Sequence, residues 1–349
     1  MTEKPLGTAI IGLGRKWAWQ LGAAAQRSNS LNLLSCYARK LETRQDFAGE
    51  FDCYAANSLE DALSRPGVEA VIISTPSHVH LEIARLCAER GLHAFVEKPM
   101  ALTLGDAVAM KDLFEQAGLV LMVNQEMRRL GSTRAIRRVI DEGRLGSIAA
   151  ASATMTLPGS FHPGSWRIQR STNRGGALMQ LGIHQIENLI YLFGPVATVQ
   201  GFVSHRAAPV DVDDTGIAQL HFESGVLGSV VSTFISPNNY TIKIFGDQAN
   251  LDCAIDMRVW PDVLQVHNQT RVTLETKSTT EEISCKPVDF LVEAYADFEN
   301  SIRSGTEPET GAQVGLAALA VVEAALHSAQ TGTTVSPQEL IRLESEVHE

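Results

Sequence analysis

The sequence has little cysteine, and this shortage narrows what the protein can be. Its five cysteines lie at positions 36, 53, 87, 253 and 285, are odd in number and form no Cys-x-x-Cys pair. Such spacing argues against a disulfide framework and against a thiolate metal site. His78 and His80 are close in sequence but have no cluster of acidic or thiol ligands beside them. We therefore expect a cytoplasmic protein with reduced thiols and no metal.

Positive charge is also scarce. The chain has 29 Lys and Arg against 40 Asp and Glu, a formal net charge of -11. An acidic protein is repelled by nucleic acid and by anionic membranes, so neither is expected as a partner. No uninterrupted apolar run approaches the roughly 18 residues of a membrane span, and the N-terminal stretch lacks the features of a secretory signal. An anionic cofactor would therefore need local cations or backbone N–H groups.

What the sequence does contain is a change of pattern along its length. With 349 residues, 44% of them apolar, it is long enough for two domains. Over roughly the first 125 residues, apolar runs alternate with amphipathic stretches, which predicts an α/β fold with a parallel sheet covered on both faces. After Arg128 strand-like segments dominate, interrupted by a long helix predicted over 177–193 and closed by two more helices. This predicts an α+β domain with a largely antiparallel sheet.

A glycine pair follows the first predicted strand. Gly12 and Gly14 permit a tight turn and let backbone N–H groups approach a pyrophosphate at a helix N-terminus. Trp17 stands where the third glycine of the dinucleotide-binding fingerprint belongs, so an ordinary turn is the alternative. The position at the start of a strand–helix series favours a nucleotide site, to which we also assign Arg15 and Lys16.

The second predicted strand ends in a basic segment, Ala38, Arg39 and Lys40. An acidic residue here would bind the ribose 2′-hydroxyl of NAD, whereas cations can accept the 2′-phosphate of NADP. The segment therefore predicts that NADP(H) is favoured over NAD(H). A solvated basic turn is the alternative interpretation.

Two more polar segments stand at the carboxyl ends of predicted strands, where open α/β sheets bind ligands. The residues assigned to the cofactor in these segments are Ser74, Thr75, Pro76, His80, Glu97 and Lys98. A lysine partly desolvated beside a cationic nicotinamide would have a lowered pKa and could act as a general base. The alternatives are a helix N-cap with surface histidines for the first segment, and a surface ion pair for the second.

The pair Gly175-Gly176 introduces the long predicted helix of the second half. Gln180 and His184 are four residues apart on it, so they should share one face. A lone histidine on an apolar helix is more often structural. The presence of the other four motifs favours a functional role here.

Taken in order, these motifs resemble the glucose–fructose oxidoreductase and inositol dehydrogenase family, often called Gfo/Idh/MocA. The likeness covers nearly the whole chain and is carried by IIGLG, STPSHVH, VEKP, GRLGSI, SWRIQ, GG-x5-GxH and the segment from IRSGTEPETG to HSAQTG. It implies a Rossmann NAD(P)-binding domain, placed at 1–126, and a substrate-binding and oligomerisation domain with an open, mostly antiparallel mixed sheet, placed at 127–349. In this arrangement the last helices can pack against the first domain.

The resemblance also implies roles for individual residues. The family's catalytic Lys and His correspond to Lys98 and His184, and its Asp to Gln180, which can hydrogen-bond a hydroxyl but cannot relay a proton. We therefore expect Lys98 to be the main proton-transfer group and His184 mostly a positioning donor. Trp166 and Arg167 are expected to contact substrate.

The expected activity is hydride transfer between a nicotinamide and a sugar, polyol or related hydroxylated molecule. Two alternatives stay open: an NAD-dependent glycosidase of the same family, and an inactive NADP(H)-binding sensor that lost its chemistry at Gln180. The strand-like stretch Gly225–Phe234 is too apolar for a sheet face left to water. We therefore expect a homodimer or homotetramer formed through the sheet.

Overall fold

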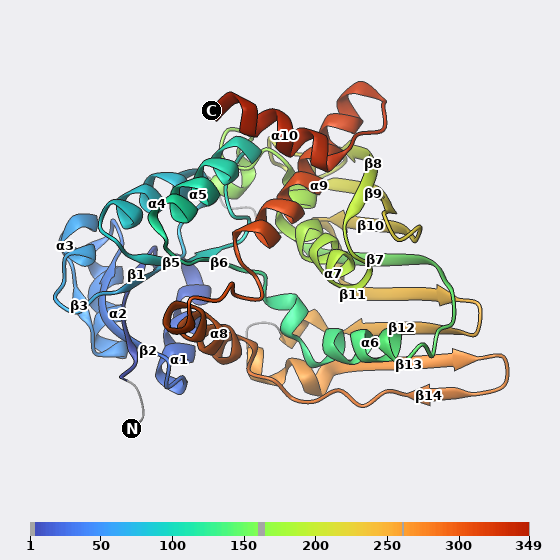
Figure 1. Ribbon diagram of the computed structural model, residues 1–349, viewed down its shortest axis with the longest axis horizontal. Coiled ribbons are helices and arrows are strands. Elements are labelled where there is room, and N and C mark those ends of the chain that lie inside the picture. The colour runs from blue at the N-terminus through green and yellow to red at the C-terminus, as the bar shows by residue number, and fades with distance from the viewer. Residues whose placement is uncertain (1–3, 160–164, 260–261, 349) are drawn as a thin grey trace. The chain divides into compact units, whose positions relative to one another are not determined.

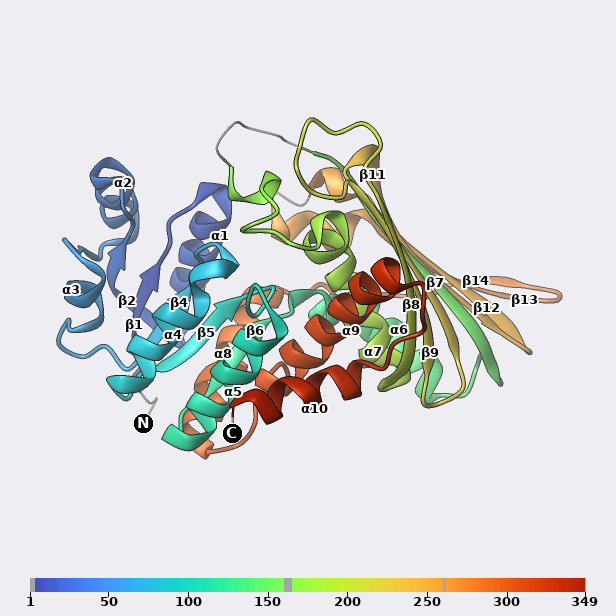
Figure 2. The ribbon, with the colours of Figure 1, turned by 90° about the horizontal axis from the view of Figure 1, so that it is seen from above.

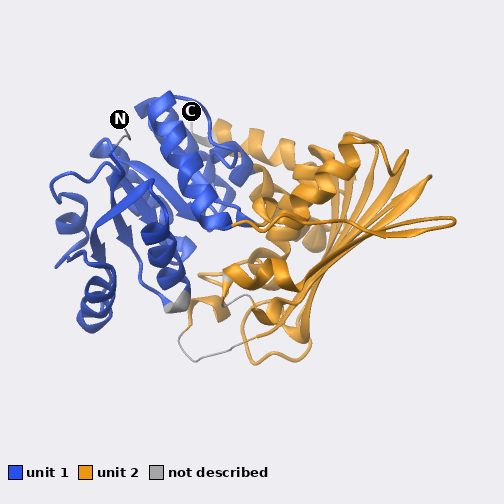
Figure 3. Ribbon diagram, turned by 90° about the horizontal axis from the view of Figure 1, so that it is seen from below, with its two compact units in different colours: residues 1–126, 289–316 blue, residues 127–288, 317–349 orange. Residues whose placement is uncertain are grey.

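The computed structural model describes residues 4–159, 165–259 and 262–348 (Figure 1). The chain forms two compact units, drawn in different colours in Figure 3. Unit 1 contains residues 1–126 and 289–316, and unit 2 contains residues 127–288 and 317–349. Each unit is therefore completed by a segment from the C-terminal part of the sequence.

Unit 1 is built on a six-stranded parallel sheet in the order β3-β2-β1-β4-β5-β6. The strands are β1 (Leu6–Ile11), β2 (Leu31–Tyr37), β3 (Tyr54–Ala55), β4 (Ala70–Ile73), β5 (His93–Glu97) and β6 (Leu121–Asn124). This order is that of a doubly wound dinucleotide-binding fold. The strand order runs outward from β1 in one direction and from β4 in the other, so it switches between these two strands. The predicted Rossmann fold is confirmed.

Helices cover both faces of this sheet, which is why its strands are mostly apolar and do not alternate with polar residues. All residues of β1, β4 and β6 are buried. The helices are α1 (Arg15–Arg27), α2 (Leu41–Phe51), α3 (Leu59–Leu63), α4 (His80–Glu89), α5 (Leu104–Ala117) and α8 (Phe290–Ser304), with the 3-10 turn η1 (Ser77–Val79) before α4. Gly118, with φ +65°, ends α5 in the left-handed conformation that favours glycine.

The last of these helices, α8, belongs to the core of unit 1 although it comes from the far end of the chain. The ring of Tyr295 lies 5.3 Å from that of Phe95 on β5, and the ring of Phe298 lies 5.7 Å from it. The Tyr295 hydroxyl donates to the Leu21 carbonyl of α1 at 3.1 Å. The first 126 residues alone therefore lack part of their own core.

Unit 2 is built on an eight-stranded sheet in the order β14-β13-β12-β11-β7-β10-β9-β8. The strands are β7 (Ile148–Pro158), β8 (Val196–Ser204), β9 (Thr215–Phe222), β10 (Leu227–Thr233), β11 (Ile235–Gly246), β12 (Ala249–Ile255), β13 (Thr270–Thr276) and β14 (Thr280–Glu282). Only β7 and β10 pair in parallel, and the other neighbours are antiparallel. The predicted open, mostly antiparallel mixed sheet is confirmed.

Helices lie on one side of this sheet, as Figure 2 shows for α6, α7 and α9. The helices and short turns are α6 (Gly131–Asp141), α7 (Ile183–Phe193), α9 (Ala312–Thr331), α10 (Pro337–His348), η2 (Glu126–Arg129), η3 (Trp166–Ile168), η4 (Leu178–Gly182), η5 (Met257–Val259) and η6 (Val263–Gln269). Burial alternates along β9, because every second side chain of this strand faces the helices. In the described part of the chain no helix covers the other face, where Phe202 and Leu227 are 57% and 56% exposed.

The structure differs from the prediction in several local elements. The sequence pattern does not reveal α2, β3, α3, β12, β14 and α10. Strand β3 has two residues and β14 is exposed throughout, so neither carries an apolar signature. The helix predicted over 177–193 is instead the π-helical turn η4 followed by α7. Helix α9 has the length and apolar character of a membrane span, with mean hydropathy 1.4 over a stretch that is 61% buried in the protein, a test that core helices also pass.

Candidate functional site

The carboxyl ends of the parallel strands lie along one edge of the unit 1 sheet. Gly12, Ala38 and Ser74 follow β1, β2 and β4, and Lys98 follows β5. Because all these strands run the same way, the segments predicted to hold the cofactor meet at this edge. Motifs that are separated in the sequence therefore lie along the same edge of the sheet.

The glycine turn shows why glycine is required at its first position. Gly12 has φ +93°, and a Cβ there would lie 2.6 Å from the backbone carbon and oxygen of Ser74. Gly14 is the N-cap of α1, has open space around it and leaves the helix without a side-chain cap or a first-turn acid. A helix N-terminus of this kind fits a pyrophosphate. The side chains of Arg15 and Lys16 lie outside the described residues.

The segment that follows β4 is held in place by the buried side chain of His80. The His80 ring is buried, with Nδ1 3.1 Å from the Met100 carbonyl oxygen and Nε2 2.9 Å from that of Thr75. Burial lowers the pKa of His80, against hydrogen bonds to backbone carbonyls that raise it. His80 thus joins the backbone after β4 to the backbone after β5 and is not a surface residue. The buried Thr75 Oγ1 has no hydrogen-bond partner among the described residues, which leaves it available to a nucleotide.

The end of β2 has more basic side chains around it than the predicted Arg39 and Lys40. Arg39 and Lys40 are exposed and Ala38 is half-buried. Arg44 of α2 donates from Nη1 to the Ala38 carbonyl at 3.2 Å. The pKa of His78 is lowered by burial and then by the charge of Arg39, which places these two side chains near each other. Arg44 and His78 were missed because neither lies next to the Ala38–Lys40 segment in the sequence.

Glu97 is a buried carboxyl group and not part of a surface ion pair. It is 8% exposed. Trp17 Nε1 and Asn124 Nδ2 both donate to its Oε1, each at 2.7 Å. Burial raises the pKa of Glu97, whereas the hydrogen bonds from Asn124 and Trp17 and the charge of Lys98 lower it. Lys98 itself is half-buried.

In unit 2 the predicted helix face begins in a π-helical turn. Gln180 lies in η4 and His184 at the start of α7, and they are 8% and 4% exposed. Gly176 has φ +50°, and a Cβ there would lie 1.9 Å from the Asp213 carbonyl oxygen, so glycine lets the loop before β9 approach η4. Single π turns inside helices are frequent at functional sites. The register between Gln180 and His184 therefore differs from the assumed α-helical spacing.

One turn further along α7, Glu187 is fully buried and pairs with a cation. Arg128 Nε donates to Glu187 Oε1 at 2.6 Å. The Arg128 guanidinium also lies 4.9 Å from the centre of the Tyr191 ring. This arrangement neutralises a charge that would otherwise be costly inside unit 2. This pair could not be predicted, because Arg128 and Glu187 are 59 residues apart along the chain.

The residues predicted to contact substrate lie in the short turn η3. Arg167 is exposed, and its guanidinium lies 4.5 Å from the centre of the Trp166 ring. Thr172 Oγ1 donates to the Trp166 carbonyl and Asn173 Nδ2 to the Arg167 carbonyl, both at 2.6 Å. The backbone of the turn is therefore fixed while the Arg167 side chain reaches solvent.

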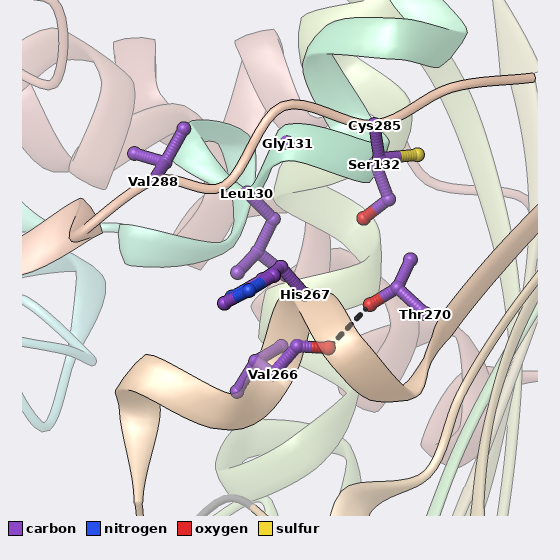
Figure 4. A pocket seen from close by; sticks show the side chains of 8 residues that line it. All are labelled: Leu130, Gly131, Ser132, Val266, His267, Thr270, Cys285 and Val288. Carbon is purple, nitrogen blue, oxygen red and sulfur yellow. Dashed lines mark hydrogen bonds between the residues drawn. The ribbon is translucent and has the colours of Figure 1, made fainter.

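A small cavity in unit 2 lies apart from these residues (Figure 4). It has a volume of about 10 Å³ and is lined by Leu130, Gly131, Ser132, Val266, His267, Thr270, Cys285 and Val288. That is room for a single water molecule, so it is no substrate pocket. Within residues 4–159, 165–259 and 262–348, no group of three or more His, Cys, Asp or Glu side chains is arranged to hold a metal.

Comparison with known proteins agrees with this geometry. The chain is 26% identical to a 1,5-anhydro-D-fructose reductase from Ensifer adhaerens, over 90% of this chain and 93% of the relative. A solved structure from Desulfitobacterium hafniense, provisionally named an NADPH-dependent oxidoreductase, is 31% identical with a TM-score of 0.93, over 97% of this chain and 100% of the other. A levoglucosan dehydrogenase in complex with NADH and levoglucosan shares the fold at 24% identity and a TM-score of 0.82, over 95% and 99% of the two chains.

The family models match both halves of the chain. Residues 6–125 match the oxidoreductase family with an NAD-binding Rossmann fold, and residues 133–252 match the GFO/IDH/MocA C-terminal domain. The relatives include sugar and polyol dehydrogenases and reductases. The chain belongs to the Gfo/Idh/MocA family of NAD(P)-binding oxidoreductases.

Proposed function

We propose that this protein is a cytoplasmic, NADP(H)-preferring dehydrogenase or reductase of a sugar or polyol, with the cofactor on unit 1 and the substrate on unit 2. The observation that carries the proposal is the carboxyl edge of the unit 1 sheet. There Gly12 presses against Ser74, α1 begins without a cap, and Thr75 keeps an unpartnered hydroxyl. This cradle fits a dinucleotide.

The preference for NADP(H) rests on the charge at the end of β2. Arg39 and Lys40 are exposed there, and no acidic side chain stands between Ala38 and the start of α2. An acidic residue would repel a 2′-phosphate, whereas these cations attract it.

The chemistry proposed for this chain is proton handling and substrate positioning. When bound, the nicotinamide supplies or accepts the hydride. Lys98 takes the proton from a substrate hydroxyl during oxidation and returns it during reduction. His184 and Gln180 hydrogen-bond the substrate, because an amide at 180 cannot relay a proton. Trp166 and Arg167 add an aromatic face and a cation for a polyhydroxylated ligand.

We further propose that the protein forms a homodimer or homotetramer through the open face of the unit 2 sheet. The four neighbouring strands β7, β10, β9 and β8 contain no Asp, Glu, Lys or Arg. Phe202 and Leu227 stand on this face more than half exposed. An uncharged sheet face of this size is typical of a buried interface.

The proposed function is tested by measuring nicotinamide absorbance with a panel of sugars and polyols, offered with NADP⁺ and with NAD⁺, and the matching ketoses and aldonolactones with NADPH and NADH. The expected result is turnover with at least one member and a higher kcat/KM with the phosphorylated cofactor. Tight NADPH binding without turnover of any member would instead favour the inactive sensor. Sugar release without net change of cofactor would favour the glycosidase.

A further inference from the structure

Trp17 is the place where this chain departs from the dinucleotide-binding fingerprint. A glycine at that position allows a helix to pack closely on its strand. Here the side chain instead extends from the first turn of α1 to the end of β5, where Nε1 donates to Glu97 Oε1 at 2.7 Å. The indole is half-buried. The departure thus creates a contact to the residue directly before Lys98.

The contact is one of two that converge on a single carboxylate oxygen. Asn124, at the end of β6, donates to the same Oε1 at 2.7 Å. The other groups that face Glu97 are Lys98, a charge of opposite sign directly after β5, and Tyr295 of α8, whose phenol is buried. Neither N–H donor carries a charge. Glu97 is therefore held by directional hydrogen bonds from two neutral side chains.

We propose that Trp17 is a positioning residue for the reaction: its indole N–H orients the buried Glu97 carboxyl group and favours its ionised form, and this sets the charge beside Lys98. The inference rests on the proposed role of Lys98 and deepens it. A buried carboxylate stays charged when hydrogen bonds favour the charged form over the neutral one. The tryptophan thereby contributes a function that the missing glycine would not.

The physical consequence follows from removing the donor. With one N–H fewer, the buried carboxylate binds a proton more readily, so the pKa of Glu97 rises further. A neutral Glu97 no longer stabilises the ammonium form of its neighbour. The limb of the pH–rate profile that reports Lys98 should then move to lower pH.

Trp17→Phe tests this with little change in ring size. The matched control is Trp19→Phe on the same helix, because Trp19 Nε1 also donates to a carboxylate, that of the exposed Glu50, at 2.6 Å. We expect Trp17→Phe to lower kcat about tenfold, the worth of one hydrogen bond to a charged group, with KM for substrate within about twofold. The Lys98 limb should move to lower pH, whereas Trp19→Phe should leave kcat and the pH profile as in the wild type.

Two further variants keep the test decisive if Trp17→Phe folds poorly. Asn124→Ala removes the other donor and should move the limb in the same direction, and Glu97→Gln should move it furthest. Combined with Glu97→Gln, Trp17→Phe should add no further shift, because both act on the same charge. An unmoved limb in Glu97→Gln, or a Trp17→Phe shift no larger than that of Trp19→Phe, overturns the inference. Either result leaves the proposed function standing as long as Lys98→Met still abolishes most turnover.

Discussion

The two units carry their candidate residues on different kinds of element. In unit 1 every assigned residue lies at or just after the carboxyl end of a parallel strand, or begins the helix after it. In unit 2, Gln180 and His184 lie on a helical segment that starts with a π turn. A parallel sheet brings together residues whose chain positions can be read from the sequence, whereas a helix-borne site depends on a local register that periodicity does not reveal.

The buried carboxylates of the two units sharpen this contrast. Glu187 in unit 2 is paired with the guanidinium of Arg128, so its charge is largely neutralised within the core. Glu97 in unit 1 accepts from the neutral donors of Trp17 and Asn124, and the cation beside it is Lys98. The first arrangement serves packing and orientation. The second holds a carboxyl group beside Lys98, the residue proposed to transfer the proton.

The largest effect is expected from removing the ammonium at the unit 1 edge. Lys98→Met should lower kcat by about 10²–10⁴, the usual worth of a general acid–base group. Cofactor Kd, measured by fluorescence, should stay nearly unchanged. Lys111→Met is the control, since Lys111 pairs with Glu115 on the surface of α5. Full activity of Lys98→Met on the true substrate would show that proton transfer lies elsewhere.

Next in size is the reversal of cofactor preference. Arg39→Asp should weaken NADPH binding by about 10- to 100-fold, the worth of a lost charge-assisted hydrogen bond, and should favour NADH. Arg85→Asp makes the same charge change on an exposed position of α4 and should alter neither Kd. Tighter NADH than NADPH binding in the unmodified protein would contradict the assignment of the β2 end.

A smaller effect is expected in unit 2, where the histidine positions and does not transfer the proton. His184→Ala should lower kcat/KM by about two- to tenfold, the range of a neutral hydrogen bond. The comparison with Lys98→Met under the same conditions decides between the two roles. A loss in His184→Ala equal to that in Lys98→Met would make the π-turn segment the main proton-transfer site.

The smallest expected change concerns assembly. Leu227→Arg places a charge in the open face of the unit 2 sheet and should reduce the mass measured by light scattering to that of the next smaller species. Leu343→Arg is the control, because Leu343 is an apolar residue of similar exposure, 45%, that lies on helix α10 and not on a strand of the sheet. A monomeric unmodified protein at micromolar concentration would rule out the proposed interface.

The sequence predicts the strands that alternate with helices, because buried parallel strands are continuous apolar runs with turn residues at their ends. It also predicts the carboxyl-end segments of the unit 1 sheet and the open mixed sheet of unit 2. It does not predict β14, an edge strand without buried residues, or the π turn, whose residues are as apolar as those of an α-helix. Those features depend on packing against neighbours and not on local composition.

Contacts between residues that are far apart in the sequence could not be predicted either. The bond from Trp17 to Glu97 spans 80 residues, and that from Arg128 to Glu187 spans 59. His80 was assigned to the cofactor, with a surface histidine as the alternative, and neither interpretation predicts that its buried ring contacts two backbone carbonyls. Each case is a buried polar group whose partner is chosen by the fold, and sequence spacing carries no information about that choice.

The contribution of α8 to unit 1 has a consequence for synthesis on the ribosome. Residues 1–126 emerge first, yet Phe95 and Leu21 meet Tyr295 only after the chain has grown far beyond them. At roughly 5–20 residues per second, the stretch from residue 126 to residue 316 takes about 10 to 40 s to make. During that interval the apolar side chains of unit 1 that pack against α8 stay uncovered, and a fragment ending at residue 126 would leave them uncovered permanently.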